Sequence, residues 1–184
     1  MNIKTGAILL LAGGRSRRMG SNKAQLPMAG TTLLNWQRER LSGLELPVWL
    51  SGPDGIVDQQ PDFQGPLAGL HSALQQHPEI SFWLLMPVDM PALPVARLRQ
   101  LAISVTDKAV PVAFQHSPLP LAIPASTQLF DTLTNWLQQA DGPRSIRALM
   151  TEFNGYWLEE SLSENEQLNV NTPEDWQAFL QTVK

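Results

Sequence analysis

Four cations follow an apolar run near the start of the chain, within "LLAGGRSRRMGSNK" (residues 10–23). Glycine lets the backbone approach a ligand closely and present its N–H groups, while arginine and lysine neutralise phosphate oxygens. These residue types predict a cradle for a polyphosphate, and a solvated basic loop is the plainer alternative. The candidate phosphate-binding residues are Gly13, Gly14, Arg15, Arg17, Arg18 and Lys23.

The spacing of this loop excludes two familiar phosphate motifs. A Walker loop needs glycine, four further residues and then Gly-Lys. Counting from Gly14 puts Met19 where the second glycine is required. The loop does not fit the dinucleotide fingerprint either.

Asp89 lies at the end of a second apolar run, in "PVDMP" (residues 87–91). Its flanking prolines stiffen the turn and give the carboxylate a defined direction. Mg²⁺ takes one or two protein carboxylates together with phosphate oxygens and water. A metal-binding role and a helix-capping role are both open for Asp89 alone, and the basic loop favours the metal.

Three further segments carry weaker signals. "GPLAGL" (residues 65–70) joins small residues to a helix start, which fits either a surface for a base or sugar or simply close packing. Asn169 and Asn171 alternate before a capped helix and offer amide hydrogen bonds, unless they only form an Asx-turn. Arg144 and Arg147 lie three apart on a short helix and face either a cleft or solvent.

The elements that must position these residues alternate between strand and helix. Strands are expected near residues 6–11, 47–52, 81–88, 108–114, 118–124 and 155–160, and helices near 33–44, 66–77, 95–103, 126–140, 142–150 and 172–183. Residues 13–30 are expected to form a loop, and the prolines at 111, 118, 120 and 124 indicate sheet edges or turns. This order predicts a single α/β domain over residues 1–184, with three layers and a mostly parallel sheet. Ligands bind beyond the carboxyl ends of the strands in such sheets, where the basic loop, Ser51 and Asp89 fall.

Composition narrows the function classes. The 184 residues are 43% hydrophobic, and the net charge is 13 − 17 = −4, which favours neither a nucleic-acid coat nor an anionic membrane surface. The chain has no cysteine, so disulfides and thiolate chemistry are excluded. The apolar run at residues 7–12 is far shorter than the roughly 20 residues of a membrane span and lacks signal-peptide features, so we expect a cytoplasmic protein. The three histidines have no metal-ligand spacing.

Four segments, "LAGGRSRRMGSNK", "GPLAG", "PVDMP" and "NVNTPED", occur in one order along the chain. Together they resemble the molybdenum cofactor guanylyltransferase family, within the nucleotidyltransferases of Rossmann-like fold. The resemblance extends from about Ile8 to Trp176. The first two segments point to guanine, because related cytidylyltransferases typically carry alanine at the second glycine and differ at "GPLAG".

This resemblance implies a reaction, its cofactor and its partners. GTP and the phosphate of molybdopterin carrying molybdenum would give the guanine dinucleotide cofactor and pyrophosphate, with Mg²⁺ on Asp89. Such chemistry needs positioning and charge neutralisation more than a protein nucleophile. Partners would include cofactor-biosynthesis or molybdoenzyme-maturation proteins.

The resemblance also implies site residues. Arg18, Lys23 and Asp89 would be catalytic, and Asn169, Asn171 and Arg144 would bind the acceptor. The nucleotide would be bound by Leu11, Ala12, Gly13, Gly14, Arg15, Lys23, Ser51, Asp58, Pro66, Leu67, Ala68, Gly69 and Asp89.

Two positions depart from the family's pattern. Asn22 stands where the family usually has aspartate before the loop lysine, and Ser51 stands where it often has asparagine. Two other functions stay open at this point. One is a nucleotidyltransferase that uses CTP or a sugar-phosphate acceptor, and the other is a non-catalytic nucleotide- or cofactor-binding partner.

Overall fold

The computed structural model describes residues 5–12, 23–52, 55–57 and 65–182. In these ranges a six-stranded sheet has the order β4-β1-β5-β7-β6-β8, and only β7 runs against its neighbours. The predicted mostly parallel α/β sheet is therefore confirmed. Its strands are β1 (Gly6–Leu11), β4 (Val48–Ser51), β5 (Phe82–Pro87), β6 (Val112–Gln115), β7 (Ser117–Pro124) and β8 (Tyr156–Ser161).

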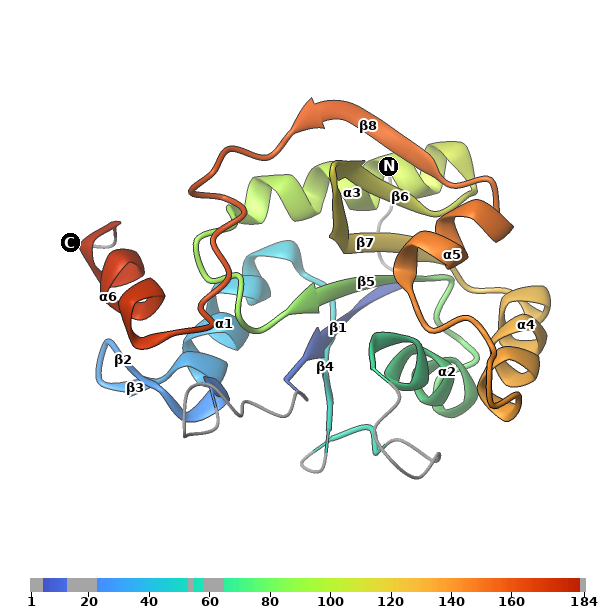
Figure 1. The fold of residues 1–184 in the computed structure, drawn as a ribbon, viewed down its shortest axis with the longest axis horizontal. Helices are drawn as coiled ribbons and strands as arrows, with labels where there is room; N and C mark the ends of the chain where they lie inside the picture. Colours follow the sequence, from blue (N-terminus) through green and yellow to red (C-terminus); the bar gives the residue numbers. More distant parts are fainter. Residues whose placement is uncertain (1–4, 13–22, 53–54, 58–64, 183–184) are drawn as a thin grey trace.

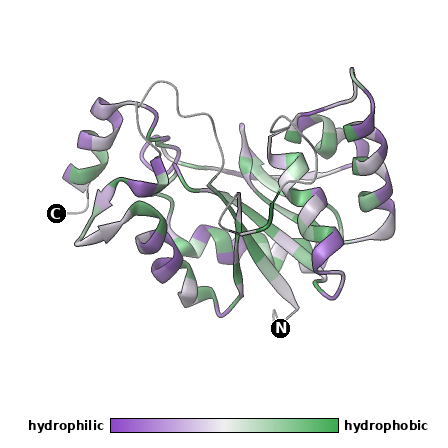
Figure 2. Ribbon diagram, turned by 90° about the horizontal axis from the view of Figure 1, so that it is seen from below, coloured by the Kyte–Doolittle hydropathy of each residue, from purple (hydrophilic) through white to green (hydrophobic). Residues whose placement is uncertain are grey.

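Six α-helices cover the two faces of this sheet (Figure 1). One face packs on α1, α3 and α6, and the other packs on α2, α4 and α5. Figure 2 shows the consequence, with hydrophobic strands in the middle and hydrophilic residues outside. The helices are α1 (Leu33–Leu41), α2 (Pro66–Gln76), α3 (Val95–Lys108), α4 (Thr127–Gln138), α5 (Ile146–Glu152) and α6 (Pro173–Thr182).

Successive side chains of the central strands point to opposite faces of the sheet, so each strand contributes to a hydrophobic core on both faces. Ile8 and Leu10 of β1 belong to the core under α1 and α3, while Ala7 and Leu9 belong to the core under α2 and α4. β1 is paired on both sides, by β4 and β5, so nearly all of its residues are buried. Gly6 opens the strand because a Cβ there would lie 2.1 Å from the Phe82 ring.

Side chains cap the starts of several helices. Thr32 accepts a hydrogen bond from the Asn35 N–H at the start of α1, and Ser126 accepts one from the Leu129 N–H at the start of α4. Gly65 precedes α2 with a φ of 78°, a conformation that side chains rarely adopt, and Pro66 is the first residue of that helix.

Residues 23–32 are more regular than the expected loop. A 3₁₀ turn, η1 (Lys23–Gln25), leads into a hairpin of β2 (Pro27–Met28) and β3 (Thr31–Thr32). The two turn residues, Ala29 and Gly30, both have positive φ, as a type I′ turn requires. Alanine is a weak signal for such a turn, which is why the sequence pattern did not reveal the hairpin.

Two other expectations were wrong in part. α3 continues to Lys108, five residues past the predicted end, because Val105 adds another buried residue to the face of the helix that packs on the sheet. The helix ends at Ala109, which has the left-handed conformation. β7 lies inside the sheet despite its prolines. Pro118 and Pro120 precede the residues that pair with β5 and lie opposite a register shift in β6, where fewer donors are needed.

The helix expected over residues 33–44 is also split in two. α1 ends at Leu41 and a 3₁₀ turn, η2 (Ser42–Leu44), follows. None of the helices in the described ranges has the length and apolar character needed to cross a lipid bilayer.

Candidate active site

The carboxyl ends of three neighbouring strands meet at one level of the sheet. Leu11, the last residue of β1, pairs with Ser51 of β4 on one side and with Pro87 of β5 on the other. The Val88 N–H also donates to the Leu11 carbonyl over 3.1 Å. The topology therefore brings the predicted Leu11 and Ser51 next to the segment that carries Asp89.

Lys23 joins Asp89 and Asn171 directly above this edge. Its Nζ lies 3.0 Å from Oδ2 of Asp89 and 2.6 Å from Oδ1 of Asn171. The side chains of Lys23 and Asp89 are 14% and 24% exposed, so the ion pair is shielded but reachable. Three residues that the sequence singled out in separate motifs thus form one cluster.

Asn171 is oriented by both ends of its amide. Its Oδ1 accepts from Lys23, while its Nδ2 donates to the Asn169 carbonyl over 3.4 Å. The Asn169 side chain turns back to donate to the Gln167 carbonyl over 3.0 Å. Both asparagines are exposed, so their amides are accessible to a ligand.

The residue between them ties this segment to the Asp89 loop. Val170 is fully buried, and its N–H donates to the Asp89 carbonyl over 2.8 Å. The backbone on which Asn171 stands is therefore held against the backbone of Asp89. The distance between the two side chains depends on this bond as well as on Lys23.

Asp175 is a member of the cluster that the sequence reading did not assign to the site. Its Oδ2 accepts the N–H groups of Asn171 (2.9 Å) and Thr172 (2.8 Å), and its own N–H donates to Oγ1 of Thr172. These bonds, led by that from Asn171 and aided by the charge of Lys23, hold the Asp175 pKa below its ordinary value. The Thr-x-x-Asp spacing of residues 172–175 is a capping-box signature that could have revealed this role.

The small side chains at the start of α2 are buried. Leu67, Ala68 and Gly69 are buried, and Leu67 packs in the core under α2 and α4. Pro66 is half-buried, and no described side chain caps this helix. The expected surface for a base would therefore be made of Pro66 and main-chain atoms rather than of the small side chains.

Arg144 does not join the cluster. Its guanidinium donates to carbonyls at the end of α4, those of Trp136, Leu137 and Gln139. Arg147 lies over the Trp157 ring, 5.8 Å from its centroid. The elements that the two arginines contact belong to the face of the sheet covered by α4 and α5, whereas α6 packs on the other face (Figure 1). These contacts favour a helix-capping role for Arg144. The expectation that it binds the acceptor stays a prediction.

Several predicted residues lie outside the described ranges. They are Gly13, Gly14, Arg15, Arg17, Arg18, Asn22 and Asp58.

The donor set at Asp89 fits a divalent cation that also binds phosphate. No group of three or more His, Cys, Asp or Glu residues among the described residues could hold a metal by itself. Mg²⁺ does not need such a cage, since one carboxylate with substrate phosphates and water completes its shell. Lys23 bonds to Oδ2 of Asp89, and the carboxylate remains partly exposed for such a contact.

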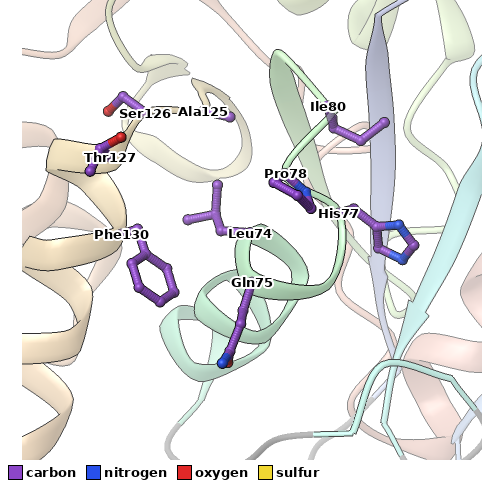
Figure 3. A pocket seen from close by; sticks show the side chains of 9 residues that line it. All are labelled: Leu74, Gln75, His77, Pro78, Ile80, Ala125, Ser126, Thr127 and Phe130. Carbon is purple, nitrogen blue, oxygen red and sulfur yellow. The ribbon is translucent and has the colours of Figure 1, made fainter.

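A hollow of about 490 Å³ lies at the opposite end of β5, between the end of α2 and the start of α4 (Figure 3). Leu74 and Phe130 lie between the two helices there. Two polar groups of its lining already have partners: Ser126 caps α4, and Nδ1 of His77 pairs with Glu79 over 3.2 Å. This hollow offers no reactive group comparable with the Lys23 cluster.

Comparison with known proteins gives a consistent family. A model of the MobA-like NTP transferase domain matches residues 8–154. The molybdenum cofactor guanylyltransferase of Xanthomonas euvesicatoria is 36% identical over 179 residues, covering 94% of this chain and 93% of the relative. The protein of that name from Rhizobium meliloti is 31% identical, with 91% and 87% covered.

Solved structures agree with the fold. Molybdopterin-guanine dinucleotide biosynthesis protein A from Archaeoglobus fulgidus superposes with a TM-score of 0.67 at 20% identity, over 96% of this chain and 98% of that one. A cytidylyltransferase from Leptospira borgpetersenii gives 0.69 at 16% identity, over 96% and 85%. The expected Rossmann-like nucleotidyltransferase fold is confirmed.

Proposed function

The chain belongs to the MobA-like NTP transferase family, and we propose that it transfers GMP from GTP to the phosphate of molybdopterin carrying molybdenum. An oxygen of the pterin phosphate attacks the α-phosphorus of GTP. A new P–O bond forms, the bond to the β-phosphate oxygen breaks, and pyrophosphate leaves. The products are the guanine dinucleotide cofactor and pyrophosphate.

The observation that carries this proposal is the Lys23–Asp89–Asn171 cluster at the carboxyl edge of the sheet. Phosphoryl transfer depends on neutralising the phosphate charges and on positioning the reactants more than on a protein nucleophile. Lys23 supplies a cation for the triphosphate, and Asp89 supplies a carboxylate for a divalent ion. Asn171 places a neutral amide beside both, where an acceptor could be held.

Lys23 has two partners before any ligand arrives, which leaves one of its three N–H donors for a phosphate oxygen, and any further phosphate contact would displace the weaker partner. A phosphate oxygen is a stronger acceptor for an ammonium group than a neutral amide oxygen. Lys23 would therefore leave Asn171 and keep Asp89, while the Asn171 amide becomes available to the acceptor. Arg18 and Arg15 of the basic loop would complete the charge neutralisation.

We also propose that the divalent ion is Mg²⁺ and that Asp89 binds it. When bound, it would neutralise the triphosphate and make pyrophosphate a better leaving group. Backbone groups of Leu11, Ala12, Gly13 and Gly14 would contact the nucleotide. Further proposed nucleotide contacts are Ser51, Asp58, Pro66, Leu67, Ala68 and Gly69, and Asn169 joins Asn171 on the acceptor side.

The deciding experiment is incubation of the chain with α-³²P-labelled GTP, Mg²⁺ and molybdopterin carrying molybdenum. We expect label in a dinucleotide product and one pyrophosphate released for each acceptor consumed. A parallel reaction with CTP tests the base, and one with a sugar phosphate tests the acceptor. Faster turnover in either would change the substrate assignment, and nucleotide binding with no turnover at all would indicate a non-catalytic partner. A cytoplasmic location and contact with molybdoenzyme-maturation proteins are further parts of the proposal.

A further inference from the structure

Two polar side chains of α1 reach into the molecule and contact the loop that carries Asp89. Gln37 is fully buried, and its Nε2 donates to the Val88 carbonyl over 3.2 Å. Nη1 of Arg40 donates to the Leu93 carbonyl over 2.6 Å, and Nη2 donates to Oε1 of Gln37 over 2.7 Å. The pair therefore holds both ends of the segment between β5 and α3.

The chemistry of these groups fixes their orientation. A guanidinium can only donate, so the Gln37 oxygen must face Arg40 and the Gln37 NH₂ must face Val88. Arg40 also lies over the Trp36 ring, 4.9 Å from its centroid. Burial lowers the Arg40 pKa to about 10.

This arrangement carries a cost in stability. Gln37 occupies the same face of α1 as Leu33 and Leu41, which are fully buried four residues to either side. Burying an amide and a guanidinium carries a desolvation cost that apolar side chains in their place would avoid. One nitrogen of Arg40, Nε, even stays without a hydrogen-bond partner in the described structure.

The contacts fall on the two peptide groups that flank Asp89. The Val88 carbonyl belongs to the peptide group directly before Asp89, and Gln37 holds it. The Asp89 carbonyl belongs to the peptide group directly after it, and Val170 holds it over 2.8 Å. Together these bonds set the direction in which the Asp89 side chain leaves the backbone, and hence where Lys23 meets it.

We propose that Gln37 and Arg40 are positioning residues for the reaction, and that they act by holding the Asp89 carboxylate in place for the metal–nucleotide complex. This inference rests on the proposed function, because it takes Asp89 as the metal ligand. Residues that orient a metal ligand typically change metal affinity or activity by about 10–100-fold when they are lost.

The test compares the wild-type chain with Gln37→Met and Gln37→Glu. Gln37→Met has a similar shape but makes neither bond. Ionised, the side chain of Gln37→Glu still accepts from Arg40 but cannot donate to the Val88 carbonyl. This variant should therefore keep the contact with Arg40 and lose the contact with the Asp89 loop. Arg40→Lys can still reach a carbonyl and serves as the conservative variant. Arg99→Met is the matched control, since Arg99 donates to the Gly43 carbonyl over 2.9 Å and does not contact the Asp89 loop.

Two measurements are made below the melting temperature of every variant. One is Mn²⁺ binding by electron paramagnetic resonance in the presence of a non-hydrolysable GTP analogue, and the other is pyrophosphate release at saturating GTP. We expect both glutamine variants to bind Mn²⁺ about 10-fold more weakly and to lose about 10–100-fold in kcat, with the acceptor KM unchanged. Arg40→Lys should lie near the wild type, and Arg99→Met should change only the melting temperature.

A result in which Gln37→Met lowers the melting temperature but leaves Mn²⁺ binding and kcat as in the wild type would overturn the inference. The same holds if Arg99→Met weakens Mn²⁺ binding equally. Failure of the proposed function is distinguishable. In that case the wild type itself forms no dinucleotide, whereas Mn²⁺ binding still reports whether Gln37 orients Asp89.

Discussion

The ammonium nitrogen of Lys23 lies 3.0 Å from a carboxylate oxygen of Asp89, although 66 positions separate the two residues in the chain. The 3₁₀ turn before the β2–β3 hairpin supplies the lysine, and the end of a central strand supplies the aspartate. The contact gives each charge a partner before substrate arrives. It also means that the nucleotide meets an ion pair rather than an isolated cation.

Lys23→Ala should weaken GTP binding by about 1.5–3 kcal/mol, the scale of a hydrogen bond to a charged group. This corresponds to a dissociation constant roughly 10- to 150-fold higher. Isothermal titration calorimetry measures it directly. Lys108→Ala, which removes an exposed lysine from the end of α3, is the control, and unaltered affinity in Lys23→Ala would remove this lysine from the phosphate site.

Asp89→Ala should abolish divalent-ion-dependent pyrophosphate release, with a loss of at least about 100-fold in kcat. The reason is the loss of the carboxylate that is proposed to bind the divalent ion. A titration of Mg²⁺ against the rate of release shows the effect. Asp131→Ala, on the exposed side of α4, should behave as the wild type, and undiminished release in Asp89→Ala would place the metal elsewhere.

Asn171→Ala separates acceptor binding from nucleotide binding. We expect the KM for the pterin acceptor to rise about 2- to 12-fold, as for a lost neutral hydrogen bond of about 0.5–1.5 kcal/mol. The GTP dissociation constant should not rise, because Asn171 competes with phosphate for Lys23 in the free chain. Steady-state kinetics with each substrate varied in turn makes the distinction, with Asn135→Ala as control. A higher GTP dissociation constant instead would move Asn171 to the nucleotide side.

Asp175 should make stability depend on pH in a defined direction. Its pKa is lowered from 3.8 in the folded chain, so its contribution is fully present above that value and is lost as pH falls through the lower folded value. Asp175→Ala should therefore reduce the melting temperature at pH 7. The difference from the wild type should shrink in the acid range below pH 3.8, as the wild-type carboxyl becomes protonated.

Glu174→Ala is the matched control for this experiment. Glu174 lies in the same first turn of α6, but the described structure gives it no bond to backbone N–H groups. Circular dichroism melts across the acid range compare the two variants. An equal loss in both, or a gap that widens on acidification, would contradict the capping role of Asp175.

Arg144→Ala should lower stability and leave acceptor binding unchanged. The guanidinium satisfies carbonyls at the end of α4, so its loss should cost about 1–2 kcal/mol. For a chain of this size that is a fall of about 2–8 °C in melting temperature. Arg38→Ala, on the exposed side of α1, is the control. A raised acceptor KM in Arg144→Ala would restore the role that the sequence suggested.

The sequence predicted the sheet well because its signals were local. β1 has the predicted bounds, and Thr32, Ser126 and Thr172 cap helices as their types indicate. Lys23 and Asp89 could be expected at the same edge, because both follow apolar strands in a parallel sheet.

What the sequence did not reveal depended on partners far along the chain. Gln37 resembles any polar residue of α1 until its burial between Leu33 and Leu41 is known. Arg144 follows Gly142 and Pro143, a sequence that does not indicate any partner for the guanidinium. Only the folded position of α4 shows which carbonyls it contacts. Likewise, β7 can lie between two other strands because β6 has a register shift, and no local sequence pattern predicts that shift.

The bond between Lys23 and Asn171 spans 148 positions, and it has a consequence for the newly made chain. Translation proceeds from the amino terminus at about 5–20 residues per second. The ribosome therefore adds Asn171 roughly 4–16 s after Asp89. During that interval Lys23 and Asp89 have been synthesised and their shared partner Asn171 has not. The Lys23–Asp89–Asn171 cluster can therefore form only after residue 171 has been added, well after the synthesis of both of its charged members.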